Sequence, residues 1–221
     1  MKMIDLTHMI TEDMPLYPGM LAPQLKPQPL GGGYPCREKT LLLMSHTGTH
    51  CDAPAHMLAD GATLDQLPLQ QFFGLAMLFD VSGYRGRRIE AELFKAAEDK
   101  LKYAQFAVLK TGYDKLWGSA AYFDGYPVLS VEAAEYLASL GLQGVAVDAI
   151  SIDDEREADS YPIHNILLGA GMIVAENLCC LDDIAGDRFL LSLLPLKYID
   201  ADGSPLRAVA FEAPAGIYYP A

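Results

Sequence analysis

Residues 45–56 read SHTGTHCDAPAH, and this short stretch holds His46, His50 and His56 of a chain with only five histidines. An aspartate, Asp52, lies between the last two of them. Imidazole and carboxylate groups bind metal ions, and imidazole also transfers protons near neutral pH. The stretch therefore indicates a functional site, and its backbone conformation decides which of the four side chains can meet.

The spacing of these side chains is unsuited to a regular element. In an extended strand, His46 and His50 would lie about 13 Å apart at roughly 3.3 Å per residue, too far to bind one ion together. A helix is disfavoured because threonines, a glycine and Pro54 occupy the segment. We predict a tight turn at Gly48, where glycine permits a positive φ, and then an extended segment that places His50 and Asp52 on one face.

Two imidazoles and a carboxylate are suitable ligands for a zinc- or manganese-like ion that keeps open positions for water. Such an ion lowers the pKa of bound water toward about 7 and so provides a nucleophile at neutral pH. From the residues alone, His56 is either a further ligand or the general acid/base that hydrolysis requires. Two alternatives stay open: a polar loop of hydrogen-bonded histidines without metal, and a Cys–His nucleophile pair that uses Cys51.

Strands and helices alternate through the middle of the chain. Short apolar runs predict strands at 39–45, 75–81, 104–110, 144–148 and 172–175. Helices are predicted over 89–100, from an N-cap at Ser130 to a glycine stop at Gly141, and from a start near Pro162. This alternation favours a single α/β (α+β) domain with a mixed sheet, extending over residues 1–221.

Three segments depart from the alternation. The proline- and glycine-rich segment 15–35 is typical of a long irregular arm. The acidic run 153–159 is interpreted as a solvated surface loop. Residues 188–213 predict two strands joined by a hairpin-type turn at 202–204.

Composition narrows the function classes. Hydrophobic residues make up 51% and charged residues 20%, as in globular proteins. The net charge of −13 argues against a nucleic-acid partner, and the apolar runs are too short to span a bilayer. The first residues lack a secretory signal, and the four cysteines show no C-x-x-C spacing. We expect a soluble cytoplasmic protein with reduced thiols and a small-molecule substrate.

The segment HTGTHCDAPAH (46–56) resembles the H-x-G-T/A-H-x-D-x-P-x-H signature of the metal-dependent cyclase family, which includes bacterial kynurenine formamidases and isatin hydrolases. The similarity continues in DMPLYPG (13–19), DAISID (148–153), HNILLGAGMIVAENL (164–178) and LPLKYIDADGSPLRAVAF (194–211), so it covers almost the whole chain. The resemblance implies the swivelling β/β/α fold and a homodimer or homotetramer.

The resemblance also implies a metal-ligand set. His46, His50 and Asp52 match the first metal ligands of the family. His164 and Glu176 match its later ligands, and in members with two ions the carboxylates of Asp52 and Glu176 would bridge them. We expect zinc, as one or two ions, with manganese as the alternative.

Two further roles follow from the resemblance. His56 matches the catalytic acid/base, and Tyr17 occupies the position at which formamidases place an aromatic side chain, often Trp, against the substrate ring. Family members often read P-G-D after that position, whereas Met20 follows Pro-Gly here. Both departures lie near the expected substrate pocket and not among the metal ligands.

The resemblance thus predicts hydrolysis of N-formylkynurenine to kynurenine and formate. A cyclic amide such as isatin, or an ester, is the alternative substrate for the same site. A non-catalytic metal-binding protein is the alternative of a different class, although His56 beside the ligands argues for catalysis.

Overall fold

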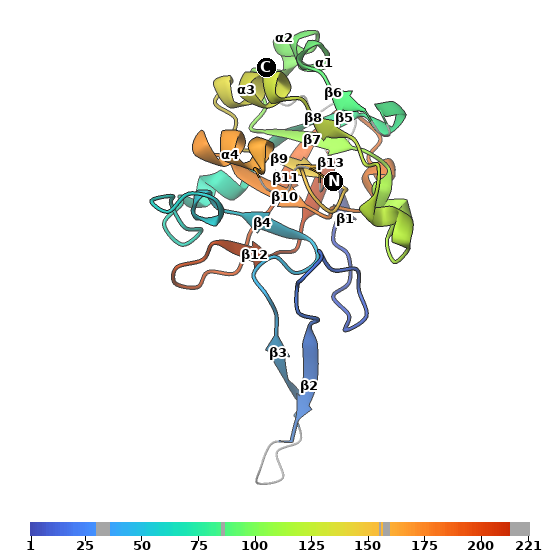
Figure 1. The fold of residues 1–221 in the computed structure, drawn as a ribbon, viewed down its shortest axis with the longest axis vertical. Coiled ribbons are helices and arrows are strands. Elements are labelled where there is room, and N and C mark those ends of the chain that lie inside the picture. The colour runs from blue at the N-terminus through green and yellow to red at the C-terminus, as the bar shows by residue number, and fades with distance from the viewer. Residues whose placement is uncertain (30–35, 85–86, 155, 157–159, 213–221) are drawn as a thin grey trace.

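The computed structural model describes residues 1–29, 36–84, 87–154, 156 and 160–212. Figure 1 shows a large sheet with helices packed on it and, at the opposite end of the molecule, a two-stranded arm that projects from the body. No helix among the described residues is long and apolar enough to cross a membrane.

One mixed sheet organises the body. Among the described residues it has nine strands, which in spatial order are β1 (Lys2–Asp5), β13 (Val209–Glu212), β11 (Arg188–Ser192), β5 (Phe73–Asp80), β7 (Phe106–Lys110), β9 (Gly144–Val147), β10 (Ile173–Glu176), β4 (His50–Asp52) and β12 (Gly203–Pro205). The pairs β5/β7, β7/β9 and β9/β10 are parallel, and the strands at both edges are antiparallel. The predicted mixed sheet is confirmed, and with it the α/β class.

Helices cover one face of the parallel strands. They are α1 (Ala91–Lys95), α2 (Glu98–Leu101), α3 (Val131–Ser139) and α4 (Pro162–Gly169). Short 3-10 helices are η2 (Pro54–His56), η3 (Leu69–Phe72), η4 (Ser82–Tyr84), η5 (Tyr113–Leu116), η6 (Ala120–Phe123) and η8 (Leu181–Asp183). The cap predicted at Ser130 is confirmed, because its hydroxyl accepts a hydrogen bond from the Ala133 amide at 3.1 Å.

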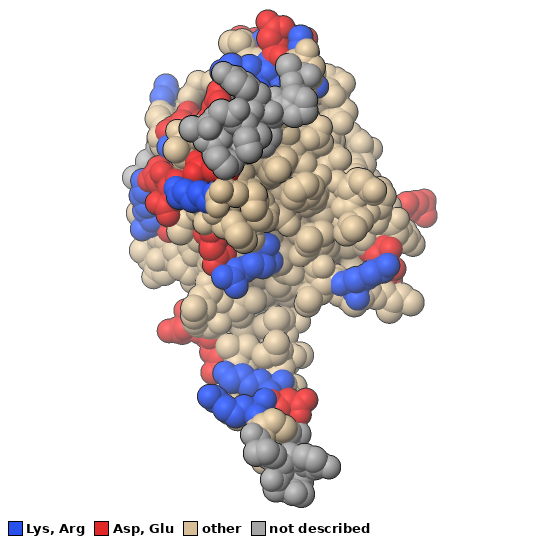
Figure 2. All heavy atoms as spheres, turned by 180° about the vertical axis from the view of Figure 1, so that it is seen from behind, with Lys and Arg blue, Asp and Glu red and all other residues tan. Residues whose placement is uncertain are grey.

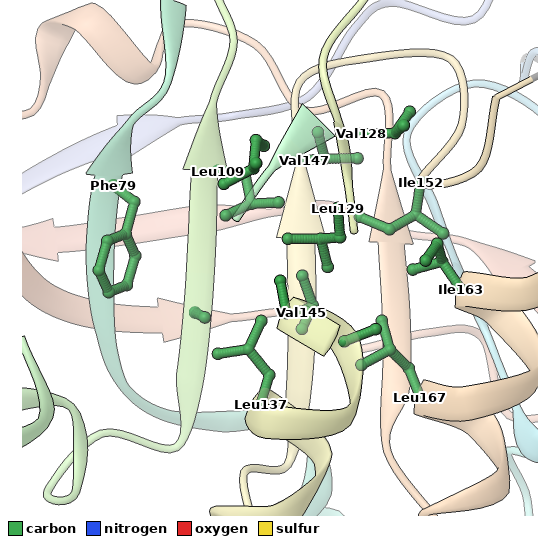
Figure 3. Packing of buried hydrophobic residues seen from close by; sticks show 14 of the residues in the cluster. Phe79, Leu109, Val128, Leu129, Leu137, Val145, Val147, Ile152, Ile163 and Leu167 are labelled. Atoms are coloured by element: carbon green, nitrogen blue, oxygen red, sulfur yellow. The ribbon is translucent and has the colours of Figure 1, made fainter. Parts of the chain in front are cut away.

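The sheet buries apolar side chains on both faces. Val145 and Val147 of β9 point toward the helices, where they pack with Leu137 and Leu167 (Figure 3). Ala146 lies between them in sequence and points to the opposite face, where a second apolar cluster fills the space enclosed by the curled sheet. This double burial explains why the central strands read as continuous apolar runs.

Two elements predicted from the sequence differ in detail from the structure. The helix predicted over 89–100 starts later than expected, because Ile89 belongs to β6 (Arg88–Ile89), which pairs with β8 (Val128–Leu129). The segment that follows forms two short helices, α1 and α2, and not one. The hairpin turn predicted at 202–204 is absent, since Gly203 and Ser204 belong to β12 and pair with β4. The two strands predicted over 188–213 are present as β11 and β13, which pair with each other in antiparallel register.

The arm is more regular than expected. Residues 24–28 form β2 (Gln24–Gln28), which pairs in antiparallel register with β3 (Glu38–Leu42). The prediction of an irregular segment over 15–35 is therefore wrong for this part, and residues 30–35 lie outside the described residues. The prediction of a strand over 39–45 holds up to Leu42, but that strand is exposed along its whole length. We call β2 and β3 the hairpin arm.

The carboxylate of Asp148 ties together the ends of β7 and β9. It is fully buried and accepts hydrogen bonds from the Thr111 amide and hydroxyl, at 2.7 and 2.5 Å, and from the Gly112 amide at 2.9 Å. We expect Asp148→Ala to lower the free energy of unfolding by about 2–4 kcal/mol, because it leaves buried donors without an acceptor. Urea unfolding followed by circular dichroism measures this, and a loss below about 0.5 kcal/mol would contradict the assignment.

Candidate metal centre and active site

The backbone of the histidine-rich stretch follows the predicted course. Gly48 adopts a φ of +67° and reverses the chain between His46 and His50. Strand β4 then places His50 and Asp52 on the same face, with His50 Nε2 3.3 Å from Asp52 Oδ1. The turn and the extended segment predicted from the sequence are therefore confirmed.

Strand β10 brings Glu176 beside this pair. In the antiparallel register of β4 and β10, Glu176 lies directly opposite His50, and Glu176 Oε2 is 3.6 Å from His50 Nε2. Glu176 Oε1 also accepts a hydrogen bond from the Ile152 amide at 2.7 Å, which fixes the carboxylate. A strand-end glutamate that was predicted as a ligand thus faces the first group of candidate ligands.

Helix α4 supplies His164 from above the sheet. His164 Nε2 lies 3.3 Å from Glu176 Oε1 and 3.6 Å from Asp52 Oδ2. Its Nδ1 is 2.7 Å from Asp153 Oδ2, and the same carboxylate accepts the backbone amides of Ile163 and His164. Asp153 therefore caps the start of α4 and orients the imidazole with Nε2 toward the two buried carboxylates.

His46 closes the group on its outer side. Its Nδ1 lies 2.6 Å from Asp52 Oδ1 and its Nε2 lies 3.0 Å from Asp202 Oδ2. Each of the three histidines predicted as ligands therefore contacts Asp52, Glu176 or both.

The ionisation states in the cluster follow from these contacts. Burial opposes protonation of His46, but its hydrogen bonds to Asp52 and Asp202 outweigh burial and raise the pKa of the imidazole to about 9. Burial likewise opposes protonation of His164, yet the surrounding carboxylates, Asp153 foremost, raise its pKa well above the usual value. Metal binding by either ring would require loss of the proton on the nitrogen that faces Asp52 or Glu176.

The donor set fits a metal ion. Ligand atoms of His50, Asp52 and Glu176 lie within 4.8 Å of one another, as do those of His46, Asp52 and His56. Within the described part of the chain, the buried Oδ2 of Asp52 has no hydrogen-bond partner. A buried carboxylate oxygen without a partner is costly unless a cation or water satisfies it.

His56 lies beside the cluster, at the end of η2. Its ring centroid is 4.0 Å from that of His46 and 5.9 Å from that of His164. Burial lowers the pKa of His56 below its usual value, so the ring is neutral and can accept a proton. The structure places His56 within reach of the cluster but on its open side, and its role as acid/base or ligand stays a prediction.

A pocket of about 340 Å³ opens onto these side chains. Apart from the candidate site residues, its wall is largely apolar, with contributions from Pro15, Leu16, Met20, Met44, Met57 and Ile150. Tyr17 lies in the wall, as predicted, with its hydroxyl 3.3 Å from that of Tyr161. Tyr161 has a φ of +41°. Its ring packs edge-on against that of His164, with 6.0 Å between the ring centroids. The pocket suits a flat, apolar ring held next to the polar cluster.

The thiol of Cys51 is poorly placed for nucleophilic catalysis. It points to the opposite face of β4 from His50 and Asp52, and it packs fully buried in the second apolar cluster. Burial raises the pKa of the Cys51 thiol well above its usual value, which disfavours the reactive thiolate. The Cys–His alternative therefore has no support from the geometry.

Three residues that support the cluster had no predicted role in it: Asp153, Asn177 and Asp202. The prediction of a solvated surface loop over 153–159 is wrong for Asp153, which is buried, and residues 155 and 157–159 lie outside the described residues. Asn177 has a φ of +56° and donates to the Gly48 carbonyl at 3.1 Å, while its own side-chain oxygen accepts the Tyr122 hydroxyl at 2.6 Å. The same Gly48 carbonyl accepts His50 Nδ1 at 2.8 Å. All three lie in segments already noted for family resemblance, which is the signal that could have identified them.

The fold and this cluster define a class of protein. Residues 4–154 match the family described as Putative cyclase, and the chain belongs to that family.

Curated relatives align over nearly the full chain. The kynurenine formamidase of Delftia acidovorans (strain DSM 14801 / SPH-1) is 31% identical over 211 residues, which is 94% of this chain and 96% of that protein. The kynurenine formamidase of Bacillus cereus (strain ATCC 14579) is 35% identical over 174 residues, or 76% of this chain and 77% of that one.

Solved structures share the fold. A predicted metal-dependent hydrolase from Bacillus stearothermophilus has a TM-score of 0.77 at 29% identity, over 95% of this chain and 97% of its own. An isatin hydrolase bound to the product analogue thioisatinate has a TM-score of 0.83 at 24% identity, over 95% and 91%. The latter similarity concerns the fold alone.

Proposed function

We propose that this protein is a metal-dependent hydrolase of aryl formamides, with N-formylkynurenine as its substrate and kynurenine and formate as products. One observation supports the proposal: the five side chains proposed as ligands line one largely apolar pocket, and the imidazole of His56 lies beside them. The kynurenine formamidases that align with nearly the whole chain support the choice of substrate.

His46, His50, Asp52, His164 and Glu176 would hold the metal, as zinc or, alternatively, manganese, with one or two ions. A bound ion of this kind activates water and stabilises negative charge that develops on a carbonyl oxygen. Neighbouring groups orient the ligands in advance, since Asp153 fixes His164 and the Gly48 carbonyl fixes His50.

His56 performs the proton transfers. Water adds to the formyl carbon, and His56 accepts its proton because the lowered pKa keeps the imidazole neutral. The carbon–nitrogen bond then breaks, and His56 delivers the proton to the departing aryl amine, so that the amine and formate leave. The apolar wall and Tyr17 hold the aromatic ring against this side of the cluster.

Parallel turnover assays with N-formylkynurenine, isatin and an aryl ester test the substrate. We expect kcat/KM to be highest for N-formylkynurenine. A higher value for isatin would keep the site but transfer the activity to cyclic amides. Absence of turnover on all three substrates, with zinc demonstrably bound, would support the non-catalytic alternative.

Tyr17 gives a more local prediction about the pocket. We expect Tyr17→Ala to raise KM by roughly tenfold, because an aromatic contact with the substrate ring is worth about 0.5–1.5 kcal/mol beyond its buried area. Tyr17→Phe is the matched control, since it keeps the ring and loses only the hydroxyl near Tyr161. Steady-state kinetics measure both, and an unchanged KM in Tyr17→Ala would contradict a substrate contact.

We also propose that the protein acts in the cytoplasm as a homo-oligomer, a dimer or a tetramer. Isolated two-stranded hairpins are marginally stable in water, yet the hairpin arm stands away from the body (Figure 1), with Leu41 and Leu42 58% and 55% exposed. The arm carries Lys26 and Lys39 against Glu38, and Arg37 directly precedes β3, whereas the chain as a whole has a net charge of −13. Figure 2 shows basic side chains gathered on the arm. A basic, apolar arm complements the acidic body of a second copy.

Sedimentation velocity tests this arrangement directly. The wild-type protein should sediment as a dimer or larger, and Leu41→Asp combined with Leu42→Asp should shift it toward the monomer because charges in an apolar contact are costly. Leu69→Asp, at a residue that is 70% exposed in η3 away from the arm, is the control. A monomeric wild-type protein at micromolar concentration would overturn the proposal.

A further inference from the structure

The outer edge of the sheet lies against His46. Strand β12 pairs with β4 so that Gly203 is opposite Asp52 and Pro205 is opposite His50. The residue that precedes β12, Asp202, is thereby carried to the outer side of the histidine-rich turn, where its Oδ2 lies 3.0 Å from His46 Nε2. The contact joins residues 156 positions apart in the sequence.

The backbone around Asp202 is fixed at two points. Its carbonyl accepts the Ala53 amide at 2.9 Å, and the carbonyl of the next residue, Gly203, accepts the Tyr198 hydroxyl. The side chain of Asp202 also accepts the Ser45 hydroxyl at 3.3 Å. The carboxylate therefore has a defined position although it is partly exposed to solvent.

Gly203 allows this close approach. A Cβ atom at this position would lie 2.5 Å from Cε1 of His46 and 2.8 Å from its Nε2. Any larger residue would displace the imidazole, so the backbone of β12 forms one wall of the ring's site. The sequence Asp202-Gly203 thus provides both a hydrogen-bond acceptor and the room for His46 to reach it.

We propose that Asp202 is a positioning residue for the metal centre, acting through His46. By accepting the Nε2–H of His46, it holds the ring with Nδ1 directed at Asp52 and the other candidate ligands. Carboxylates and carbonyls that bind the second nitrogen of a ligating histidine fix its tautomer and orientation. Asp153 and the Gly48 carbonyl do the same for His164 and His50, so Asp202 completes the set.

This inference rests on the proposed function, because it assumes that His46 binds metal. Its test uses metal affinity, which needs no substrate: metal-free protein is titrated with zinc in competition with a chromophoric chelator. We expect Asp202→Ala to weaken zinc binding by about 10–100-fold, the usual effect of losing such a partner. Asp202→Asn should stay within about threefold of wild type, since its amide oxygen can still accept the Nε2–H.

Asp60→Ala is the matched control, because it removes an exposed carboxylate from the loop after η2. A second variant with its own control tests the close approach of the β12 backbone to His46. Gly203→Ala should weaken zinc binding by displacing the His46 ring, whereas Gly83→Ala should not, because a Cβ at Gly83 would meet no atom within 4 Å. If Asp202→Ala fails to give the wild-type circular dichroism spectrum, Asp202→Asn and Gly203→Ala decide the question.

Three outcomes would overturn the inference: wild-type affinity in Asp202→Ala, an Asp202→Asn variant as weak as Asp202→Ala, or wild-type affinity in Gly203→Ala. The second would show that the negative charge matters and the hydrogen bond does not. Failure of the proposed function looks different. In that case the wild-type protein itself would bind no zinc, or would bind it without turnover, whatever residue occupies position 202.

Discussion

The Asp52→Ala variant is expected to lose both its metal and its activity, the largest effect of any single substitution considered. Asp52 is buried among the candidate ligands. Its Oδ1 lies 2.6 Å from His46 Nδ1 and 3.3 Å from His50 Nε2, and its Oδ2 lies 3.6 Å from His164 Nε2. Metal activation supplies several kcal/mol of charge stabilisation, so turnover should fall by at least about 10³-fold.

Two measurements separate this effect from misfolding. Zinc content after gel filtration should fall from the wild-type stoichiometry to near zero, while the circular dichroism spectrum keeps its wild-type shape. Asp60→Ala should retain both metal and turnover, because Asp60 lies in an exposed loop. An Asp52→Ala protein that keeps its full zinc content would contradict the assignment of Asp52 as a ligand.

The His56→Ala variant should separate chemistry from metal binding. Because His56 lies on the open side of the cluster and its lowered pKa leaves a neutral ring, we expect it to transfer protons and not to hold the ion. Loss of a general acid/base typically costs about 10²–10⁴-fold in rate. The zinc content and zinc affinity should stay at the wild-type level.

His56→Gln is the matched variant, since it keeps a polar side chain of similar reach but cannot shuttle a proton. Both variants should therefore show the same loss of kcat. Zinc content measured beside kcat decides the role. If His56→Ala loses its metal together with its activity, His56 is a ligand and the acid/base must be sought elsewhere.

The local part of the site was predictable because it lies in one short segment. Gly48 is the residue that permits the turn between His46 and His50, and the period of an extended strand then puts His50 and Asp52 on the same face. The cap at Ser130 was predictable for a similar reason, since capping depends on residues only three positions apart.

Features that depend on long-range pairing were not predictable in this way. The segment 202–204 carries residues typical of a turn, but pairing with β4, some 150 positions earlier, makes it a strand. Asp202 gains its place beside His46 only through that pairing. The late start of the helix predicted over 89–100 has the same origin, because Ile89 is drawn into a strand pair with Leu129.

The candidate ligands His164 and Glu176 were predictable only in part. Each is unremarkable by local pattern, one at a helix start and the other at a strand end, and only the resemblance to the cyclase family gave them roles. The structure brings them within 3.6 Å of side chains from β4, and the register of β10 against β4 is the physical reason for Glu176.

The central claim is that a metal held by this cluster is required for hydrolysis of an aryl formamide. Turnover of N-formylkynurenine by metal-stripped protein, before and after addition of zinc or manganese, tests it most directly. We predict no turnover without metal and recovery in proportion to the metal bound. Full turnover by the stripped protein, or bound metal without any turnover, would contradict the claim.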